Sequence, residues 1–459
     1  MSDGLLHSRL KSAVDGYEPA SEKALISYCV DGMVPSAIVA PDSIESLSAI
    51  LKMASFHGYT VIPRGGGSKM DFGLPPSRGD IAVSMKFLNR IISHDPADQT
   101  STVEAGITMA CLQAGLGKKG QYLPLDPPHG DVSTLGGVLA TNACGLLRTS
   151  YGTARDMVIG VRVVQADGTI VKSGGQVVKN VAGYDLNKMY IGSLGTLGIL
   201  AEVTLKLQPL PAGGKIVIGR MPLMEMATDC AFRIMDSDIM PSFLELSNPE
   251  TISLALQSGG VQDDDIPHQA GFPIVAGLIG LEETVLWQVN ECERICKEMG
   301  AIDVIQMAGD RYHQTLESLR RFPSGCSMRP ARYSKVTCRA SVTPDQVGDL
   351  YQLAEDRCQR YSIGLGFLSH FTSGHVSFVF YQDAPFQEAN LEALASIISD
   401  LRNFSEQHGA FVMEHAPVAL KKEVDVWGSS RGNQEIMARL KSRFDPKGLL
   451  NPGRFVHGI

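Results

Sequence analysis

The sequence predicts an α+β protein with more than one domain. Its 459 residues exceed what a single hydrophobic core usually supports. Helical and strand-like stretches alternate along the second half without the strict strand–helix–strand order of a parallel α/β protein. A Pro- and Gly-rich segment at 208–214 interrupts the pattern near the middle, where such a composition is typical of a domain boundary.

The composition is that of a globular protein with a sizeable core. Apolar residues make up 44% and charged residues 20%, and no apolar run approaches the roughly 20 residues of a membrane helix. The formal charge of −8 comes without a block of like charges, so the basic stripe of a nucleic-acid-binding protein is missing. The first residues lack the features of a secretory signal, and we expect cytoplasmic residence, with peripheral attachment to a membrane complex left open.

The nine cysteines, an odd number, argue against a disulfide framework. Cys292 and Cys296 form the one close pair, on one face of an expected helix. Two buried thiols are the favoured interpretation, and a metal or redox pair is the alternative. An iron–sulfur cluster usually needs four closely spaced cysteines. Because this sequence does not supply them, any such cluster would belong to a partner.

In the first half, residues 36–63 are expected to form a strand, a helix and a strand, with Asp42 and Glu45 capping the helix. The helix carries an apolar stripe of Ile44, Leu47, Ile50, Leu51 and Ala54. Further strands are expected at 101–105 and 198–207, a helix at 109–116, a loop at 123–129, and a hairpin joining 157–165 to 169–171.

The second half is expected to combine helices and strands in a different domain. The expected helices are 224–235, 281–299, 344–358 and 386–407, and the expected strands are 274–281, 334–342, 375–381 and 410–414. A last helix at 433–444 leads into the segment Asp445-Pro446-Lys447-Gly448-Leu449-Leu450-Asn451-Pro452-Gly453-Arg454.

Three glycine-rich segments suggest a large ligand lying against the main chain. Residues 64–68 follow a strand, so their N–H groups can converge on a phosphate, although a flexible turn is the alternative. Residues 179–186 and 192–199 form the second segment, whose glycines suit backbone packed on a flat ligand. Residues 133–145 offer small hydroxyl and amide groups for a dinucleotide, or else form a tightly packed turn and helix start.

A literal Gly-x-Gly-x-x-Gly pattern occurs at Gly115, Gly117 and Gly120. It follows an expected helix rather than a strand, and no suitably placed acidic residue lies downstream. We interpret it as a helix end with a turn and not as a Rossmann fingerprint.

Taken in order, these motifs resemble the FAD-linked oxidases of the vanillyl-alcohol oxidase (PCMH) type, and within them the glycolate oxidase subunits GlcD and GlcE. The resemblance is strong over residues 30–210 and weak beyond, apart from the tail from Val424, which is closer to GlcE. It implies a PCMH-type FAD-binding domain of two α/β subdomains (1–211), a smaller α+β cap domain (212–423), and a tail (424–459) returning to the FAD domain.

The resemblance also implies which residues bind FAD. The pyrophosphate would lie against Arg64, Gly65, Gly66, Gly67 and Ser68. The adenosine and flavin would be lined by Pro127, Thr134, Gly136, Gly137, Thr141, Asn142 and Gly145, with Gly198 and Ile199 beside the adenine half. Some relatives attach FAD through a histidine just after the glycine loop; Ser68 and Lys69 stand there in this chain, so we expect a flavin that is not tethered at that point.

Oxidation of a 2-hydroxy acid needs a cation for the carboxylate, a base for the hydroxyl proton, and the Cα hydrogen directed at flavin N5. Arg339, at a place where relatives carry such a residue, is the candidate cation, with Arg329 and Arg332 as alternatives. An ordinary solvated strand arginine is the competing interpretation. The candidate bases are His370, His375 and His415, each of which could instead be structural.

Catalytic subunits of the family carry Gly-His-x-Gly-Asp-Gly-Asn-x-His and Glu-His-Gly motifs that together place a divalent metal. The first is broken here between Ser369 and His375, although Glu414 and His415 match the second, so we expect no metal. The leading hypothesis is a GlcE-like FAD subunit of a glycolate or D-lactate dehydrogenase, with an iron–sulfur partner and a GlcD-like flavoprotein partner. The alternatives are an FAD-containing relay or scaffold subunit, and a freestanding D-2-hydroxyacid dehydrogenase.

Overall fold

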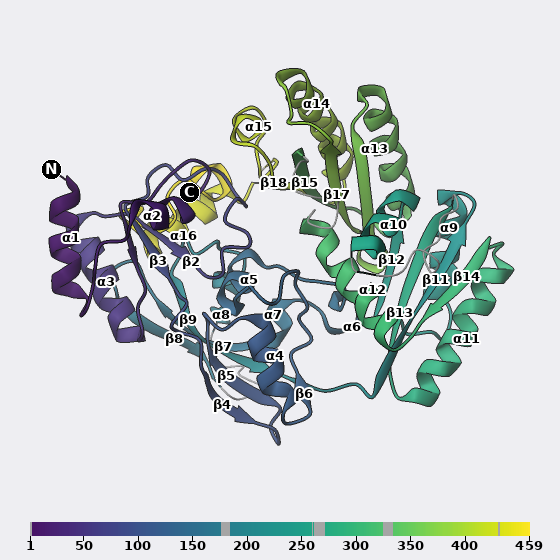
Figure 1. Ribbon diagram of the computed structural model, residues 1–459, viewed down its shortest axis with the longest axis horizontal. Helices are drawn as coiled ribbons and strands as arrows, with labels where there is room; N and C mark the ends of the chain where they lie inside the picture. Colours follow the sequence, from purple (N-terminus) through teal and green to yellow (C-terminus); the bar gives the residue numbers. More distant parts are fainter. Residues whose placement is uncertain (1, 176–183, 259, 261–270, 325–333, 430–431) are drawn as a thin grey trace. The chain divides into compact units, whose positions relative to one another are not determined.

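A computed structural model describes the chain apart from residues 1, 176–183, 259, 261–270, 325–333 and 430–431. It divides into two compact units (Figure 1). Unit 1 contains residues 1–144, 152–210 and 430–459, and unit 2 contains residues 145–151 and 211–429. The chain thus changes unit after Leu210 and after Ser429, and also makes an excursion at 145–151 that the sequence did not suggest.

The first part of unit 1 is a parallel three-stranded sheet in the order β1 (Ala37–Val39), β3 (Ile81–Ser84), β2 (Val61–Arg64). Helix α3 (Ile44–His57) connects β1 to β2, which confirms the expected strand–helix–strand unit, although β3 lies between the two strands. The helix is capped by Ser43, whose Oγ accepts a hydrogen bond from the Ser46 amide, and not by Asp42 as expected. Helices α1 (Ser2–Ala13) and α2 (Glu22–Ser27) precede the sheet.

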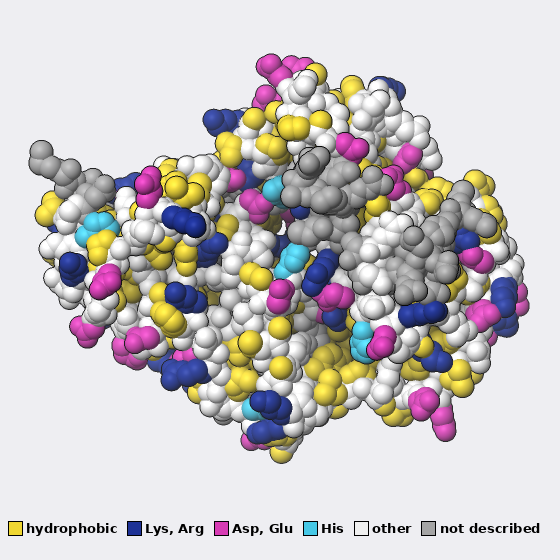
Figure 2. Space-filling view, viewed as in Figure 1, with side chains coloured by type: hydrophobic (Ala, Val, Ile, Leu, Met, Phe, Trp, Pro, Cys, Tyr) yellow, Lys and Arg dark blue, Asp and Glu magenta, His cyan; other side chains and the backbone are white. Residues whose placement is uncertain are grey.

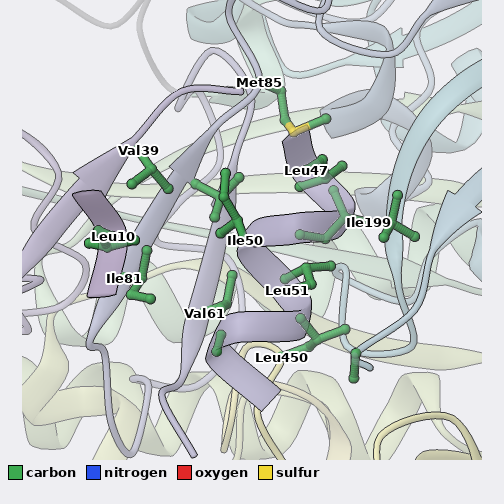
Figure 3. Packing of buried hydrophobic residues seen from close by; sticks show 14 of the residues in the cluster. Leu10, Val39, Leu47, Ile50, Leu51, Val61, Ile81, Met85, Ile199 and Leu450 are labelled. Atoms are coloured by element: carbon green, nitrogen blue, oxygen red, sulfur yellow. The ribbon is translucent and has the colours of Figure 1, made fainter. Parts of the chain in front are cut away.

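The core of this part is closed by the C-terminal tail. Leu47, Ile50 and Leu51 of α3 are at most 1% exposed and pack toward the strands (Figure 3). Leu450 belongs to the same cluster and forms a parallel bridge with Val61 of β2. Residues from the two ends of the sequence therefore share one hydrophobic core.

The second part of unit 1 is an antiparallel sheet in the order β4 (Ile91–Asp95), β5 (Thr100–Glu104), β9 (Ile199–Lys206), β7 (Val158–Val164), β8 (Ile170–Gly174). The expected hairpin of β7 and β8 is confirmed. Helix α4 (Met109–Gly117) ends at the glycine pattern, with Gly120 at φ 69°, which confirms a helix end followed by a turn. The remaining elements are β6 (Gln121–Tyr122), β10 (Gln208–Pro209), α5 (Leu135–Thr141), α7 (Ala154–Met157), α8 (Asn187–Tyr190) and α16 (Gln434–Phe444).

Unit 2 is built on an eight-stranded antiparallel sheet, and with it the predicted α+β class is confirmed. The strand order is β14 (Asp303–Met307), β11 (Gly213–Met221), β13 (Phe272–Gly280), β12 (Phe243–Ser247), β16 (Gly364–His370), β17 (His375–Gln382), β15 (Ser334–Ser341), β18 (Ala410–His415). Its helices are α6 (Arg148–Tyr151), α9 (Met224–Met235), α10 (Pro249–Ser258), α11 (Glu282–Glu298), α12 (Asp310–Arg321), α13 (Val347–Tyr361), α14 (Glu388–Ser405) and α15 (Val418–Glu423).

The two faces of this sheet differ in what covers them. Helices α9, α11, α13 and α14 pack on one face (Figure 1), over a layer of aromatic side chains that includes Phe367, Phe378 and Phe411. Helices α10 and α12 pack on the other face, against the cluster containing Phe243, Leu368 and Val379. Because side chains alternate between faces along a strand, Ser377 and His375 lie on the same face as Val379.

The described surface mixes charges of both signs. On the face shown in Figure 2, acidic and basic side chains alternate without a continuous basic band among the described residues. Within the part of the chain that the structure describes, no helix has the length and apolar character needed to cross a membrane.

Candidate functional site

Unit 1 contains a recess formed largely by main chain. Its open volume, including solvent at the mouth, is about 480 Å³. It brings together the end of β2, the start of α5 and the turn before β9, three segments that are far apart in sequence. The lining includes the predicted cofactor residues Arg64, Gly65, Thr134, Gly136, Gly137, Gly198 and Ile199. It also includes Pro63, Met85, Ala105, Ala140, Ser193, Leu194, Gly195 and Leu200.

The glycine loop after β2 packs directly on the segment before α5. A Cβ on Gly65 would lie 2.0 Å from Oγ1 of Thr134, and one on Gly66 would lie 1.7 Å from the carbonyl oxygen of Val132. Ser68 and Ser133 share a hydrogen bond of 2.9 Å between their hydroxyl groups. Glycine is therefore required at 65 and 66 for the loop to reach this position.

Arg64 contributes to the recess while its guanidinium is held from outside. Nη1 donates to the carbonyl oxygen of Ser27 at 2.7 Å, and the guanidinium lies over the ring of Tyr28, 4.3 Å from its centroid. The stacking and the hydrogen bond fix the side chain in one orientation. The predicted role of this residue at a pyrophosphate remains a prediction.

Asn142 ends helix α5 in the left-handed conformation, with φ 47°. Its Oδ1 atom is buried and has no hydrogen-bond partner among the described residues. A buried amide oxygen without a partner is costly, and a ligand donor would satisfy it. Together with the glycine-lined recess, this atom fits a dinucleotide bound along α5.

The other predicted cofactor residues lie outside the lining of the recess. Pro127 is buried in the loop that precedes α5, and Thr141 Oγ1 donates to the carbonyl oxygen of Gly137 at 2.9 Å. Gly67 follows in the glycine loop, and Gly145 falls within unit 2. The sequence segment 179–183, which suggested a flat ligand, lies outside the described residues, as do Arg329 and Arg332.

Unit 2 carries a polar row across three strands of its sheet. Glu245 on β12, His370 on β16 and His375 on β17 are consecutive cross-strand partners, so their side chains share one face. His370 Nδ1 lies 2.7 Å from Oε1 of Glu245, whose side chain is fully buried. A carboxylate accepts hydrogen bonds, so His370 donates from Nδ1 and leaves its Nε2 atom as the acceptor.

His375 is held in a defined tautomer. Its Nδ1 atom lies 3.1 Å from the carbonyl oxygen of Ser373, which can only accept, so Nδ1 carries the proton and Nε2 the lone pair. Burial, followed by the positive charge of Arg148, lowers the pKa of His375 to about 4. The imidazole is therefore neutral near pH 7, with an acceptor nitrogen available as a base.

Arg339 lies on the same face of β15 and pairs with Glu414 of β18, at 3.0 Å between Nη1 and Oε1. The pairing of these strands shifts between Thr337 and Cys338, where Glu414 is the extra residue of a β-bulge. His415 follows opposite Thr337. Bulges turn side chains away from the regular alternation, and this one brings the Glu414 carboxylate to Arg339.

Arg148, on helix α6, and Glu245 were not predicted from the sequence. Arg148 belongs to the excursion 145–151, where Thr149 and Thr372 share a hydrogen bond of 2.9 Å and Leu146 is 1% exposed within the unit 2 core. No sequence pattern indicates that this segment joins the β16–β17 turn. A signal for Glu245 is present in the sequence, because its carboxylate is the one charged group in a short, buried and mainly apolar strand.

Among the residues that the structure describes, no group of three His, Cys, Asp or Glu side chains is arranged to hold a metal ion. Cys292 and Cys296 are both buried on α11, and Cys230 of α9 lies 4.0 Å from Cys296 between sulfur atoms. Hydrogen bonding to Cys296, followed by burial, holds the pKa of Cys230 and Cys292 well above the ordinary thiol value.

Comparison with protein families identifies the class. The FAD binding domain family matches residues 35–174, and the family described as FAD linked oxidases, C-terminal domain, matches residues 210–455. The chain therefore belongs to the FAD-linked oxidases, its cofactor is FAD, and it is an FAD-linked oxidoreductase.

Curated relatives match nearly the whole chain. It is 28% identical to glycolate oxidase subunit GlcD of Bacillus subtilis (strain 168), covering 92% of this chain and 89% of the relative. It is 25% identical to D-2-hydroxyglutarate dehydrogenase of Stutzerimonas stutzeri (strain A1501), covering 99% of each. It is 26% identical to D-lactate dehydrogenase of Archaeoglobus fulgidus, covering 92% of this chain and 91% of the relative.

Solved structures share the fold. p-Cresol methylhydroxylase with substrate bound has a TM-score of 0.77 at 16% identity, covering 99% of this chain and 97% of that chain. Alkyldihydroxyacetonephosphate synthase has a TM-score of 0.74 at 21% identity, covering 97% of this chain and 85% of that chain. The predicted PCMH-type fold is thereby confirmed.

Proposed function

We propose that this protein is an FAD-dependent dehydrogenase of 2-hydroxy acids, with FAD held by unit 1 and the substrate recognised by the polar row of unit 2. The observation that carries the proposal is the state of His375. Its imidazole is neutral near pH 7 and has its lone pair on Nε2, and the positive charges of Arg148 and Arg339 help to lower its pKa. The names of the relatives, which act on glycolate, D-lactate and D-2-hydroxyglutarate, support this substrate class.

Each side chain has a role that follows from its chemistry. Arg339 offers a planar fork of donors to the substrate carboxylate. His375 Nε2 accepts the proton of the substrate hydroxyl group. Bound FAD supplies the acceptor for the hydride that leaves the substrate Cα, and the product is a 2-oxo acid. His370, oriented by Glu245, and His415, beside the bulge, are the remaining candidates for proton transfer.

We infer further that the protein works as one subunit of a complex, passing electrons to an iron–sulfur partner beside a GlcD-like flavoprotein. The resemblance of the tail to GlcE supports this role. The cysteines in the described part of the chain are free thiols, and several are buried, which suits a reducing compartment. We accordingly propose a cytoplasmic location, with any membrane association made through partners.

Two alternatives each have an observation in their favour. The Glu414 carboxylate already occupies Arg339 and would compete with a substrate carboxylate, which favours a relay or scaffold subunit that binds FAD without oxidising substrate. The match to D-2-hydroxyglutarate dehydrogenase over 99% of both chains favours a freestanding D-2-hydroxyacid dehydrogenase.

Anaerobic titration of the purified, FAD-loaded chain tests the proposal. Glycolate, D-lactate and D-2-hydroxyglutarate are added separately while the visible flavin absorbance is followed, with the L-enantiomers of the two chiral acids as controls. Bleaching by one acid in the wild type, and not in His375→Gln, supports a dehydrogenase. A flavin that responds only after an iron–sulfur partner is added excludes the freestanding enzyme. A flavin that no acid reduces, with or without the partner, excludes substrate oxidation by this chain.

A further inference from the structure

One residue in the lining of the recess has an unfavourable backbone conformation. Leu194 has φ 50°, in the left-handed region that residues with a Cβ rarely adopt, while its neighbours Gly192 and Gly195 occupy that region freely. Leu194 is 7% exposed and lines the recess. Such conformations persist only where surrounding contacts impose them, and they are concentrated at ligand sites.

The contacts that impose this conformation come from two directions. On the side of α5, the Leu194 amide donates to the carbonyl oxygen of Ala140 at 2.8 Å. From the C-terminal tail, Asn451 Nδ2 donates to the carbonyl oxygen of Leu194 at 2.5 Å. Both polar groups of one strained peptide segment are therefore fixed, the second by a residue more than 250 positions away in sequence.

The tail reaches this position through a buried ion pair. Lys441 Nζ donates to Asp445 Oδ2 at 2.7 Å and to the carbonyl oxygens of Leu450 and Thr196, each at 2.9 Å. The same aspartate accepts hydrogen bonds from the amides of Leu449 and Leu450, at 2.9 and 2.7 Å. All three ammonium protons of Lys441 are used, and one of them is donated to the turn that contains Leu194.

The tail also joins the strand that leads into the glycine loop. The Val61 amide donates to the carbonyl oxygen of Leu449 at 2.8 Å, and the Asn451 amide donates to the carbonyl oxygen of Val61 at 2.9 Å. Asn451 is 2% exposed and is itself left-handed, with φ 45°. One short segment thus fixes β2 and the turn at 192–198, two of the walls of the recess.

We propose that Asn451, supported by the Lys441–Asp445 pair, is a positioning residue for FAD that acts by holding Leu194 in its strained conformation. Without the Asn451 hydrogen bond, Leu194 relaxes toward negative φ and the peptide groups beside it turn away from their places in the recess. The inference concerns cofactor binding alone and does not depend on the proposed substrate.

A double-mutant cycle on the full-length chain tests the inference. The variants are Asn451→Ala, Leu194→Gly and the double variant. Glycine adopts φ near 50° without strain, so a glycine at 194 does not need the Asn451 hydrogen bond to hold this conformation. Each protein is stripped of flavin and titrated with FAD by fluorescence, and the visible circular dichroism of the bound flavin is recorded. Arg439→Ala is the matched control, since Arg439 lies on the same tail in an exposed pair with Glu435.

Asn451→Ala is expected to weaken FAD binding about tenfold, the typical worth of one hydrogen bond, and to change the flavin circular dichroism. In the Leu194→Gly background the same substitution is expected to weaken FAD binding less than about threefold. Arg439→Ala is expected to leave the affinity for FAD unchanged. An equal loss in both backgrounds, or no loss in either, overturns the proposal. Should Asn451→Ala fail to fold, Asn451→Ser enters the same cycle under the same criterion.

Discussion

At the scale of single residues, His375 links the proposed chemistry to stability. Its pKa is lowered by burial and by the charges of Arg148 on α6 and Arg339 on β15. His370 on β16 makes a smaller contribution in the same direction. A histidine that titrates near pH 4 when folded and near 6.5 when unfolded takes up its proton first in the unfolded chain. Its contribution to folding is therefore intact above pH 6.5 and is lost as the pH falls toward 4.

We predict that unit 2 loses about 2 kcal/mol of stability between pH 7.5 and pH 5 through this residue. Urea unfolding of the wild type and of His375→Gln at both pH values measures the difference. The variant is expected to lose less stability over this interval, whereas His313→Gln, at an exposed position, is expected to follow the wild type. Parallel pH profiles for wild type and His375→Gln would contradict the assignment.

The Arg339–Glu414 pair gives a second prediction at this scale. Arg339→Met is expected to raise KM for the 2-hydroxy acid between about tenfold and a hundredfold, because a charged hydrogen-bond partner of the carboxylate is lost. Glu414→Gln is expected to lower KM about threefold, since the arginine no longer has a competing carboxylate. Steady-state kinetics measure KM for both variants. Arg357→Met is the control, because Arg357 pairs with Asp400 elsewhere in unit 2. A rise in KM for Glu414→Gln would show that the pair itself binds substrate.

Residue chemistry together with the family resemblance pointed to part of this face of the sheet. Arg339, His370, His375 and His415 were predicted as candidates because arginine can bind a carboxylate and histidine can transfer a proton. Their partners were not recognisable, because Glu245 meets His370 only through the register of β12 with β16. Register depends on long-range pairing that a single sequence does not state.

At the scale of elements, the glycine loop after β2 is defined by close packing. Gly66→Ala is expected to weaken FAD binding by more than tenfold, because its Cβ would lie 1.7 Å from the Val132 carbonyl oxygen and the loop would have to move. Gly117→Ala is the control, since a Cβ at that helical glycine comes no closer than 3.9 Å to Leu210. Fluorescence titration with FAD measures both variants. Unchanged affinity for FAD in Gly66→Ala would show that the loop is not part of the cofactor site.

Helices α9, α11, α13 and α14 of unit 2 were predicted, whereas helices α10 and α12 were missed. Helix α12 was missed although its buried residues Tyr312, Leu316 and Leu319 recur at helical spacing. Strand β12 was missed because all five of its residues are buried and it shows no alternation. Strand β11 begins at Gly213, inside the segment read as a linker; Gly214 is needed there because the Tyr312 ring lies 2.6 Å from where a Cβ would stand.

At the scale of the whole molecule, the two units have separate cores and only one of them is expected to bind FAD. Ligand binding to the folded state stabilises the part that binds it. We predict that a hundredfold excess of FAD over its dissociation constant raises the unfolding temperature of unit 1 by about 5 °C or more and leaves that of unit 2 unchanged. Differential scanning calorimetry of the flavin-free chain with and without FAD measures this. Equal shifts for both units would contradict it.

The compact units of the structure include one stretch, 145–151, that the expected division into domains did not separate. Predicted limits at 211 and 423 lie near the changes of unit after Leu210 and Ser429, where composition or family resemblance gave a cue. The excursion at 145–151 has no such cue, because Leu146 and Leu147 look like the continuation of the preceding small-residue segment. Its destination is set by the burial of Leu146 in a core that is assembled from residues far along the chain.

That excursion limits how the protein can be recombined. Consider a chimera in which residues 211–429 are replaced by those of a relative. The relative's core would then pack against Leu146 of this chain, and the histidine at the position of His375 would lie under the charge of Arg148 of this chain. A graft meant to transfer the whole of unit 2 has to carry 145–151 as well, although this stretch lies within the segment matched by the FAD binding domain family. The end of the segment matched by the FAD binding domain family and the start of unit 2 in the molecule are therefore different boundaries.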